Sequence, residues 1–167
     1  MAQSYDLIVQ DSSDPWITHT EGNQVTLPSS ALYEENHFRN LYRILKPNGI
    51  LNLQAETFTI PSDLDGIVHW RKQALDIGFA SAKYGSIFIS SYPTGQIGFL
   101  LLEKSPDEAA TIEDIQKRFR DMRKKGHTTT YYHPQLQTSS FDLPLWVHET
   151  IYGSTQNNDP KDNDKEL

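Results

Sequence analysis

A continuous apolar run near the start of the chain ends in a turn of acidic and hydroxyl side chains. The run Leu7-Ile8-Val9 is followed, after Gln10, by the string Asp-Ser-Ser-Asp-Pro of residues 11–15. Continuous apolar strands are typical of parallel sheets, which are covered on both faces. Ligands of such sheets bind in the crevice beyond the carboxyl ends of the strands. The pattern therefore predicts an α/β fold with two carboxylates at its ligand site, which would suit a cationic substrate.

The next hundred residues alternate between predicted helices and strands. Apolar side chains recur at helical spacing in residues 30–46 and again in 62–77, and each stretch ends at a Pro-Asn-Gly or Gly signal. Between them, residues 50–55 are expected to form a second parallel strand whose end faces the same crevice. Two further strands, at roughly 84–90 and 97–103, flank a Pro-Thr-Gly turn and predict an antiparallel hairpin at a sheet edge.

Other segments carry weaker signals. Residues 16–30 are polar and contain glycine and proline, which indicates a long loop. A capping box at residues 105–108 precedes a basic helix expected from Ile112 to Lys125. We expect the aromatic residues of 131–146 to pack back on the sheet.

Composition limits the classes of function. The chain has 167 residues, which favours one domain, and we place it at residues 1–152. Residues 153–167 are almost wholly polar and are expected to form a disordered tail. A net charge of −7 disfavours nucleic-acid binding and favours cationic ligands. The basic residues of 117–125 are therefore interpreted as a solvated helix face.

Metal and membrane sites are also disfavoured. The chain has no cysteine, and its six histidines show no short metal-binding spacing. No apolar stretch approaches the ~20 residues of a membrane span. The first residues lack the charged and apolar regions of a signal peptide, so we expect a cytoplasmic protein without membrane partners.

A second unusual string of residues occurs later in the chain. Residues 92–99 read Tyr-Pro-Thr-Gly-Gln-Ile-Gly-Phe. Together with the string at 11–15, and in the same order along the chain, it resembles the spermidine synthase family of polyamine aminopropyltransferases from about Tyr5 to Ile151. The resemblance implies the C-terminal half of the catalytic domain. Its fold would be a partial Rossmann-like sheet of the S-adenosylmethionine-dependent methyltransferase type, with parallel strands, a C-terminal antiparallel hairpin and helices on both faces.

The resemblance also implies a reaction. The family moves an aminopropyl group from decarboxylated S-adenosylmethionine, a co-substrate, to putrescine or a similar diamine, and needs no other cofactor and no metal. The attacking amine must be freed of its proton, because an alkylammonium with a pKa of ~10.4 is rarely a nucleophile at neutral pH. By family position Asp11 accepts that proton, while the expected substrate-binding residues are Ser12, Ser13, Asp14, Tyr92, Gln54 and Glu56.

Simpler interpretations exist for each motif. Asp-Ser-Ser-Asp-Pro alone is most often an ordinary turn, Tyr92-Pro93 a hairpin tip, and Gln54 a residue that bonds a strand end. The sequence also departs from the family. It has no Gly-x-Gly-x-x-Gly string for the donor, and residues 16–31 replace the Gly-Pro-Ala segment that usually follows Asp-Pro.

Three interpretations therefore remain open. The chain is part of a spermidine synthase, or an amine N-methyltransferase on the same scaffold. Alternatively, it is a non-catalytic or regulatory polyamine-binding paralogue that forms a homo-oligomer or pairs with a complete subunit.

Overall fold

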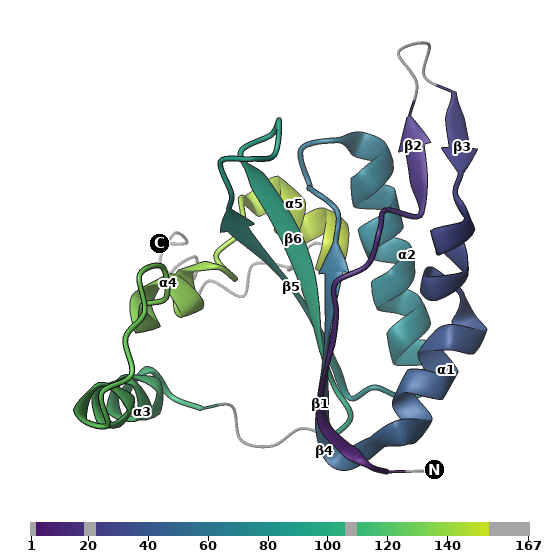
Figure 1. Ribbon diagram of the computed structural model, residues 1–167. Helices are drawn as coiled ribbons and strands as arrows, with labels where there is room; N and C mark the ends of the chain where they lie inside the picture. The colour runs from purple at the N-terminus through teal and green to yellow at the C-terminus, as the bar shows by residue number, and fades with distance from the viewer. Residues whose placement is uncertain (1–2, 19–22, 106–109, 154–167) are drawn as a thin grey trace, which may run out of the picture.

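A four-stranded mixed sheet forms the centre of the molecule in the computed structural model, which describes residues 3–18, 23–105 and 110–153. The strand order is β1-β4-β6-β5. The strands are β1 (Tyr5–Gln10), β4 (Leu45–Ala55), β6 (Gln96–Glu103) and β5 (Ser81–Phe88). Helices lie on both sides of this sheet (Figure 1), as the sequence predicts. They are α1 (Glu35–Ile44), α2 (Pro61–Ile77), α3 (Ile112–Lys124), α4 (Pro134–Ser139) and α5 (Leu145–Tyr152).

The strand directions bring three segments to one edge of the sheet. β1 pairs in parallel with β4, with Gln10 opposite Leu53, so both strands end at the same edge. β6 runs antiparallel to β4 and places Gly98 opposite Ala55. The turn between β5 and β6 therefore meets the ends of β1 and β4. The predicted parallel pair and antiparallel hairpin are both confirmed.

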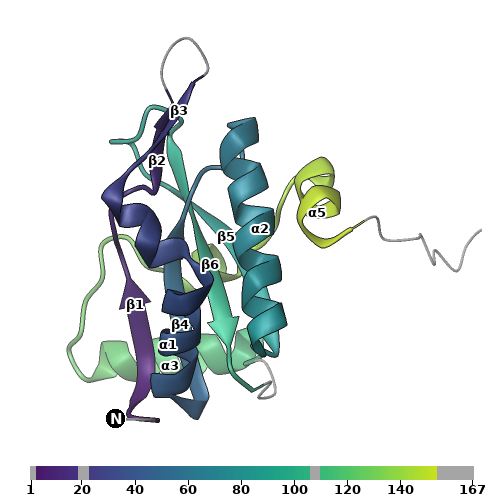
Figure 2. The same cartoon turned by 90° about the vertical axis from the view of Figure 1, so that its right-hand side faces the viewer.

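The main core lies between the sheet and the helices α1 and α2, which cover one face of it (Figure 2). Phe38 of α1 and Ile67 of α2 are fully buried against Leu51 and Leu53 of β4. α2 begins with a proline in its first turn and ends at Gly78, whose φ of +122° suits glycine. The predicted second helix is thus confirmed almost to the residue. On the opposite face, α3 and α4 line a cavity of about 550 Å³ with Leu101.

The first predicted helix is shorter than its pattern. A 3₁₀ helix, Pro28–Tyr33, precedes α1, and α1 already ends at Ile44. The chain then enters β4 at Leu45, because the residue before a proline, here Lys46, is disfavoured in a helix.

The predicted long loop at residues 16–30 is wrong in part. Two short strands, β2 (Trp16–Thr18) and β3 (Gln24–Thr26), pair antiparallel there. Each has only three residues, which is too short to show an alternating pattern.

The C-terminal part packs on the body of the fold. Val147 and Ile151 of α5 are buried, and the backbone N–H of Tyr84 donates to the Tyr152 hydroxyl over 2.8 Å. Helix α3 begins after a capping box of Thr111 and Asp114. The predicted capping box at 105–108 falls largely on 106–109, and the predicted tail on 154–167, outside the described residues. None of the described helices is long and apolar enough to cross a membrane.

Candidate active site

Residues from three separate segments line one cavity at the shared strand edge. Asp11 follows β1, Gln54 lies near the end of β4, and Tyr92 lies in the turn between β5 and β6. The cavity has a volume of about 430 Å³. Its remaining lining is mostly apolar or small, and no lysine or arginine of the described chain lines it. The other lining residues are Val9, Gln10, Asn52, Ile87, Ile89, Ser91, Ile97, Gly98 and Phe99.

Glu56 is a buried acid just after β4; it does not line this cavity but lies beside Asp14. Its side chain is 8% exposed, and its Oε1 atom has no hydrogen-bond partner among the described residues. Burial, with the nearby carboxylates of Asp14 and Asp63, raises its pKa from 4.5 to about 8, and a hydrogen bond with Asp14 acts in the same direction. A carboxyl group in such surroundings holds a proton near neutral pH unless a cation reaches it.

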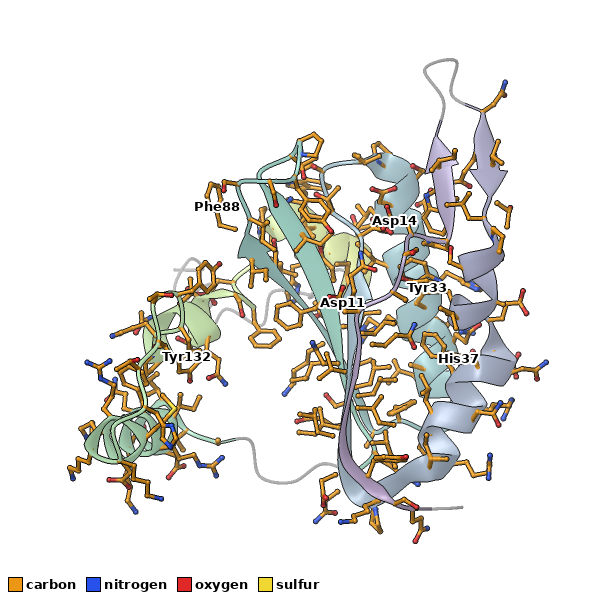
Figure 3. All side chains as sticks on the ribbon, viewed as in Figure 1. Asp11, Asp14, Tyr33, His37, Phe88 and Tyr132 are labelled. Carbon is orange, nitrogen blue, oxygen red and sulfur yellow. The ribbon has the colours of Figure 1, made fainter. Side chains whose placement is uncertain are left out.

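The same acids influence Tyr92 electrostatically. Its pKa is raised by partial burial, and further by Asp14, Asp11 and Glu56 in that order. Its side chain is 41% exposed, so it lies at the mouth of the site and not in the core. Tyr92 and Asp11 thus line the same cavity, and Figure 3 labels Asp11 and Asp14.

The other residues predicted to bind substrate lie in different surroundings. Ser12 and Gln54 are joined through the hydroxyl of Tyr33, to which Ser12 donates over 3.2 Å and which donates to Gln54 over 2.8 Å. Ser13 is exposed and takes no part in this network. Asp14 has its backbone carbonyl held by the hydroxyl of Ser29 over 2.5 Å.

Tyr33 was not among the site residues predicted from the sequence. It is 4% exposed, packs on the ring of Trp70 with centroids 4.6 Å apart, and has its pKa raised to about 12, chiefly by burial. A buried tyrosine needs a partner for its hydroxyl, but the sequence could not show that this partner would be Gln54.

Sequence reasoning also missed Asp63 and the anchor of the β2–β3 hairpin. Asp63 is 8% exposed and accepts hydrogen bonds from the side chains of Trp16 and Ser62. The Trp16 ring lies beside α2, where a Cβ atom at Gly66 would come within 2.5 Å of it. The sequence signal for this anchor was one tryptophan, Trp16, in a polar stretch. The described residues contain no group of three His, Asp or Glu side chains arranged to hold a metal ion.

The hairpin is tied to the site by polar side chains. Gln96, at the start of β6, donates to the hydroxyl of Thr57 over 2.9 Å and accepts a short hydrogen bond from Ser86 of β5. These contacts fix the base of the turn that carries Tyr92 against the end of β4.

Comparison with known proteins gives one consistent result. The family model of the spermine/spermidine synthase domain matches residues 1–114. A spermine synthase of Saccharomyces cerevisiae is 29% identical over 150 residues, which are 89% of this chain and 44% of that protein. The spermidine synthase of Schizosaccharomyces pombe is 28% identical over 154 residues, 91% of this chain and 46% of that protein. The chain thus spans about half the length of the curated relatives it matches.

Solved structures agree on the fold. The spermidine synthase of Thermotoga maritima superposes with a TM-score of 0.66 at 20% identity, over 90% of this chain and 44% of that one. A spermidine synthase in complex with the transition state analogue AdoDATO gives a TM-score of 0.70 at 20% identity, over 90% of this chain and 45% of that one.

Proposed function

This chain belongs to the spermine/spermidine synthase family, and from that premise we propose that it carries the amine-binding half of an aminopropyl-transfer site. The acceptor is putrescine or a similar diamine, and the donor is decarboxylated S-adenosylmethionine. The family's donor motif, a glycine-rich turn, has no counterpart in this sequence. We therefore assign to these 167 residues the recognition and deprotonation of the amine.

One observation supports this proposal most strongly. Asp11 and Tyr92, from two separate segments, line one cavity, and the carboxylates of Asp14 and Glu56, which do not line it, also raise the pKa of Tyr92. No lysine or arginine of the described chain lines that cavity. Of these acids Glu56 is buried, and a buried carboxyl group without a cationic partner costs free energy that a bound ammonium group would offset.

The proposed roles follow from the charges. The nearby carboxyl groups of Asp14 and Glu56 hold the distal ammonium group of the diamine, while Asp11 faces the reacting nitrogen. That nitrogen attacks the propyl carbon next to the sulfonium, so the N–C bond forms and the C–S bond breaks, with its electron pair left on sulfur. The secondary ammonium that results gives one proton to Asp11. The rate gain from such a positioned base is about 10²–10⁴-fold.

The direct test is to measure methylthioadenosine after incubation with decarboxylated S-adenosylmethionine and putrescine. We expect no product from the purified 167-residue chain by itself, because alignment of donor and amine contributes several kcal/mol of barrier lowering. We expect product when the amino-terminal half of a relative, which carries the donor motif, is co-purified with it. Failure of every such pairing to give product, while the same relative is active when whole, would refute the proposed transfer.

A second candidate function is amine binding without transfer. It is favoured by one observation, namely that the sequence holds carboxylates suited to an amine but no Gly-x-Gly-x-x-Gly string for the donor. The same carboxylates would then bind the diamine for a regulatory purpose. Binding of putrescine by the chain, together with inactive pairings, would support this candidate.

A further inference from the structure

The two edge strands of the central sheet differ in what covers their outer side. At β5 the backbone N–H of Tyr84 donates to the Tyr152 hydroxyl over 2.8 Å. The N–H of Ser86 donates to the backbone carbonyl oxygen of Ser140 over 2.7 Å. At β1, within the part of the chain that the structure describes, no hydrogen bond from outside β4 reaches the backbone of residues 7–10. The outer N–H and C=O groups of β1 are therefore available to pair with another strand.

The side chains that β1 exposes most are apolar. Tyr5, Leu7 and Val9 are 49%, 57% and 61% exposed. Ile8 packs against the core on the side of α1 and α2, and successive side chains of a strand point to opposite faces. Leu7 and Val9 therefore share the other face, on the side of the sheet that carries α3 and α4 in Figure 1. An open strand edge with such an apolar stripe, and with neither lysine nor proline, is a site for pairing with a further strand.

β1 complements a second copy of itself. Two identical strands that pair antiparallel about a two-fold axis make every contact twice. With Ile8 opposite Ile8 of the second copy, Leu7 lies opposite Val9 on both sides of the axis. Asp6 then lies opposite Gln10. Apolar side chains thus meet apolar ones and polar side chains meet polar ones, which is the arrangement that stabilises cross-strand pairs.

The neighbouring registers are less favourable. A pair centred on Leu7 would set Asp6 opposite Ile8, and a pair centred on Val9 would set Leu7 opposite Asp11. In both, a carboxylate faces an apolar side chain and loses part of its solvation without gaining a partner. We propose that this chain forms a two-fold dimer through antiparallel pairing of β1, with Ile8 at the axis.

The dimer joins two four-stranded sheets into one sheet of eight strands. An axis perpendicular to the sheet keeps α1 and α2 of both copies on the same side. The pairing uses none of the carboxylates of the proposed amine site, so it occurs whether or not the chain binds a diamine.

The net charge predicts how the dimer responds to salt. Each copy carries a net charge of −7, so two copies repel each other at long range and added salt should strengthen the dimer. An association of the basic helix α3 with the acidic remainder of another copy would instead be weakened by salt, because there opposite charges attract.

Sedimentation velocity of the 167-residue chain over a range of protein concentrations tests the dimer. We expect the mass to rise from 19.1 kDa for one copy toward twice that value. Leu7→Lys sets a lysine opposite Val9 on both sides of the axis and should weaken dimerisation by about tenfold or more. The matched control Leu145→Lys, on α5, replaces a leucine that is 69% exposed and should dimerise as wild type. Because both leucines are exposed, circular dichroism should show the same fold in all three proteins.

Introduced cysteines test the register. The chain has no cysteine of its own, so only the new thiols can be oxidised to a disulfide. We expect a mixture of the Leu7→Cys and Val9→Cys variants to form a covalent dimer several-fold faster than either variant alone. The reason is that Cβ atoms directly opposite each other lie ~4.5–5.5 Å apart, whereas diagonal neighbours lie ~7–8 Å apart.

A chain that stays monomeric at every concentration would overturn the proposal. If that monomer formed an equimolar complex with the amino-terminal half of a relative, and Leu7→Lys abolished the complex, the β1 edge would belong to that half instead. A dimer that Leu7→Lys leaves unchanged would place the contact elsewhere and overturn the proposal as well, and weakening of that dimer by salt would point to α3. Equal rates of disulfide formation in the mixture and in the single variants would overturn the register.

Discussion

The hydroxyl of Tyr84, in β5, donates a hydrogen bond over 2.8 Å to the backbone carbonyl oxygen of Glu56, just beyond the end of β4. Between them lies Gly98 of β6. A Cβ atom there would come within 2.5 Å of that carbonyl oxygen and would overlap the Tyr84 hydroxyl. The glycine thus leaves room for the contact that ties the hairpin to the buried acid.

Gly98→Ala is expected to destabilise the fold and loosen the site together. Both neighbours of the new methyl group are held in place, so crowding should lower the free energy of unfolding by about 1–3 kcal/mol. Chemical denaturation measures this loss. Gly126→Ala is the control, because its φ of +87° is unfavourable to alanine but a Cβ there has nothing within 4 Å. An equal effect of the two changes would show that crowding at Gly98 is unimportant.

Asp11→Asn should abolish most transfer in the paired, active protein without unfolding it. The asparagine is nearly the same size but cannot accept the amine proton, and a positioned general base contributes ~10²–10⁴-fold. Initial rates of methylthioadenosine formation give the comparison, with Asp142→Asn, an exposed aspartate outside the cavity lining, as a matched control. A rate within a few-fold of the parent would remove Asp11 from the mechanism.

Tyr92→Ala should weaken use of the diamine far more than use of the aminopropyl donor. Tyr92 lines the cavity with Asp11, on the side where we propose that the amine binds, and its pKa is raised further by Asp14 and Glu56. Steady-state kinetics with each substrate varied in turn decide the question, and Tyr92→Phe separates the ring from its hydroxyl. If only the donor KM changed, the hairpin would have been assigned to the wrong substrate.

Glu56 should make stability depend on pH. Its pKa is raised from 4.5 to about 8, so between these values the folded protein holds a proton that the unfolded chain has released. The free energy of unfolding therefore falls as the pH rises through this range, by on the order of a few kcal/mol, and levels off above it.

Glu56→Gln should remove most of that fall and be more stable than wild type above pH 8. Urea denaturation from pH 5 to pH 9 provides the measurement, and the exposed Glu34→Gln should keep the wild-type profile. Asp63, whose pKa is also raised by burial, accounts for a smaller remaining slope. A wild-type profile that is flat across this range would mean that Glu56 is ionised throughout.

Much of the architecture could be predicted from local patterns. The run Leu7-Ile8-Val9 and the stretch 50–55 did form parallel strands, and the helix at 61–77 has its proline and glycine signals at its two ends. These signals act within a few residues, because proline and glycine restrict or widen the backbone angles of their own position. The β2–β3 hairpin escaped prediction, since Trp16 is held by Asp63 and Trp70, which lie far away in the sequence.

The candidate site likewise combines features that local sequence predicts with features that depend on distant residues. Local sequence patterns were enough to predict which acids and which tyrosine lie near the strand edge, because the carboxyl ends of parallel strands meet there and the hairpin returns to it. The pKa values and hydrogen bonds of these groups, in contrast, depend on residues that are distant in the sequence. Burial beside Asp14 and Asp63 made Glu56 a weak acid, and a hydrogen bond from the buried Tyr33 hydroxyl holds the side-chain oxygen of Gln54. Residue type sets whether a side chain can donate, accept or titrate. Solvent exclusion and its partners in space set its pKa and the hydrogen bonds that it makes.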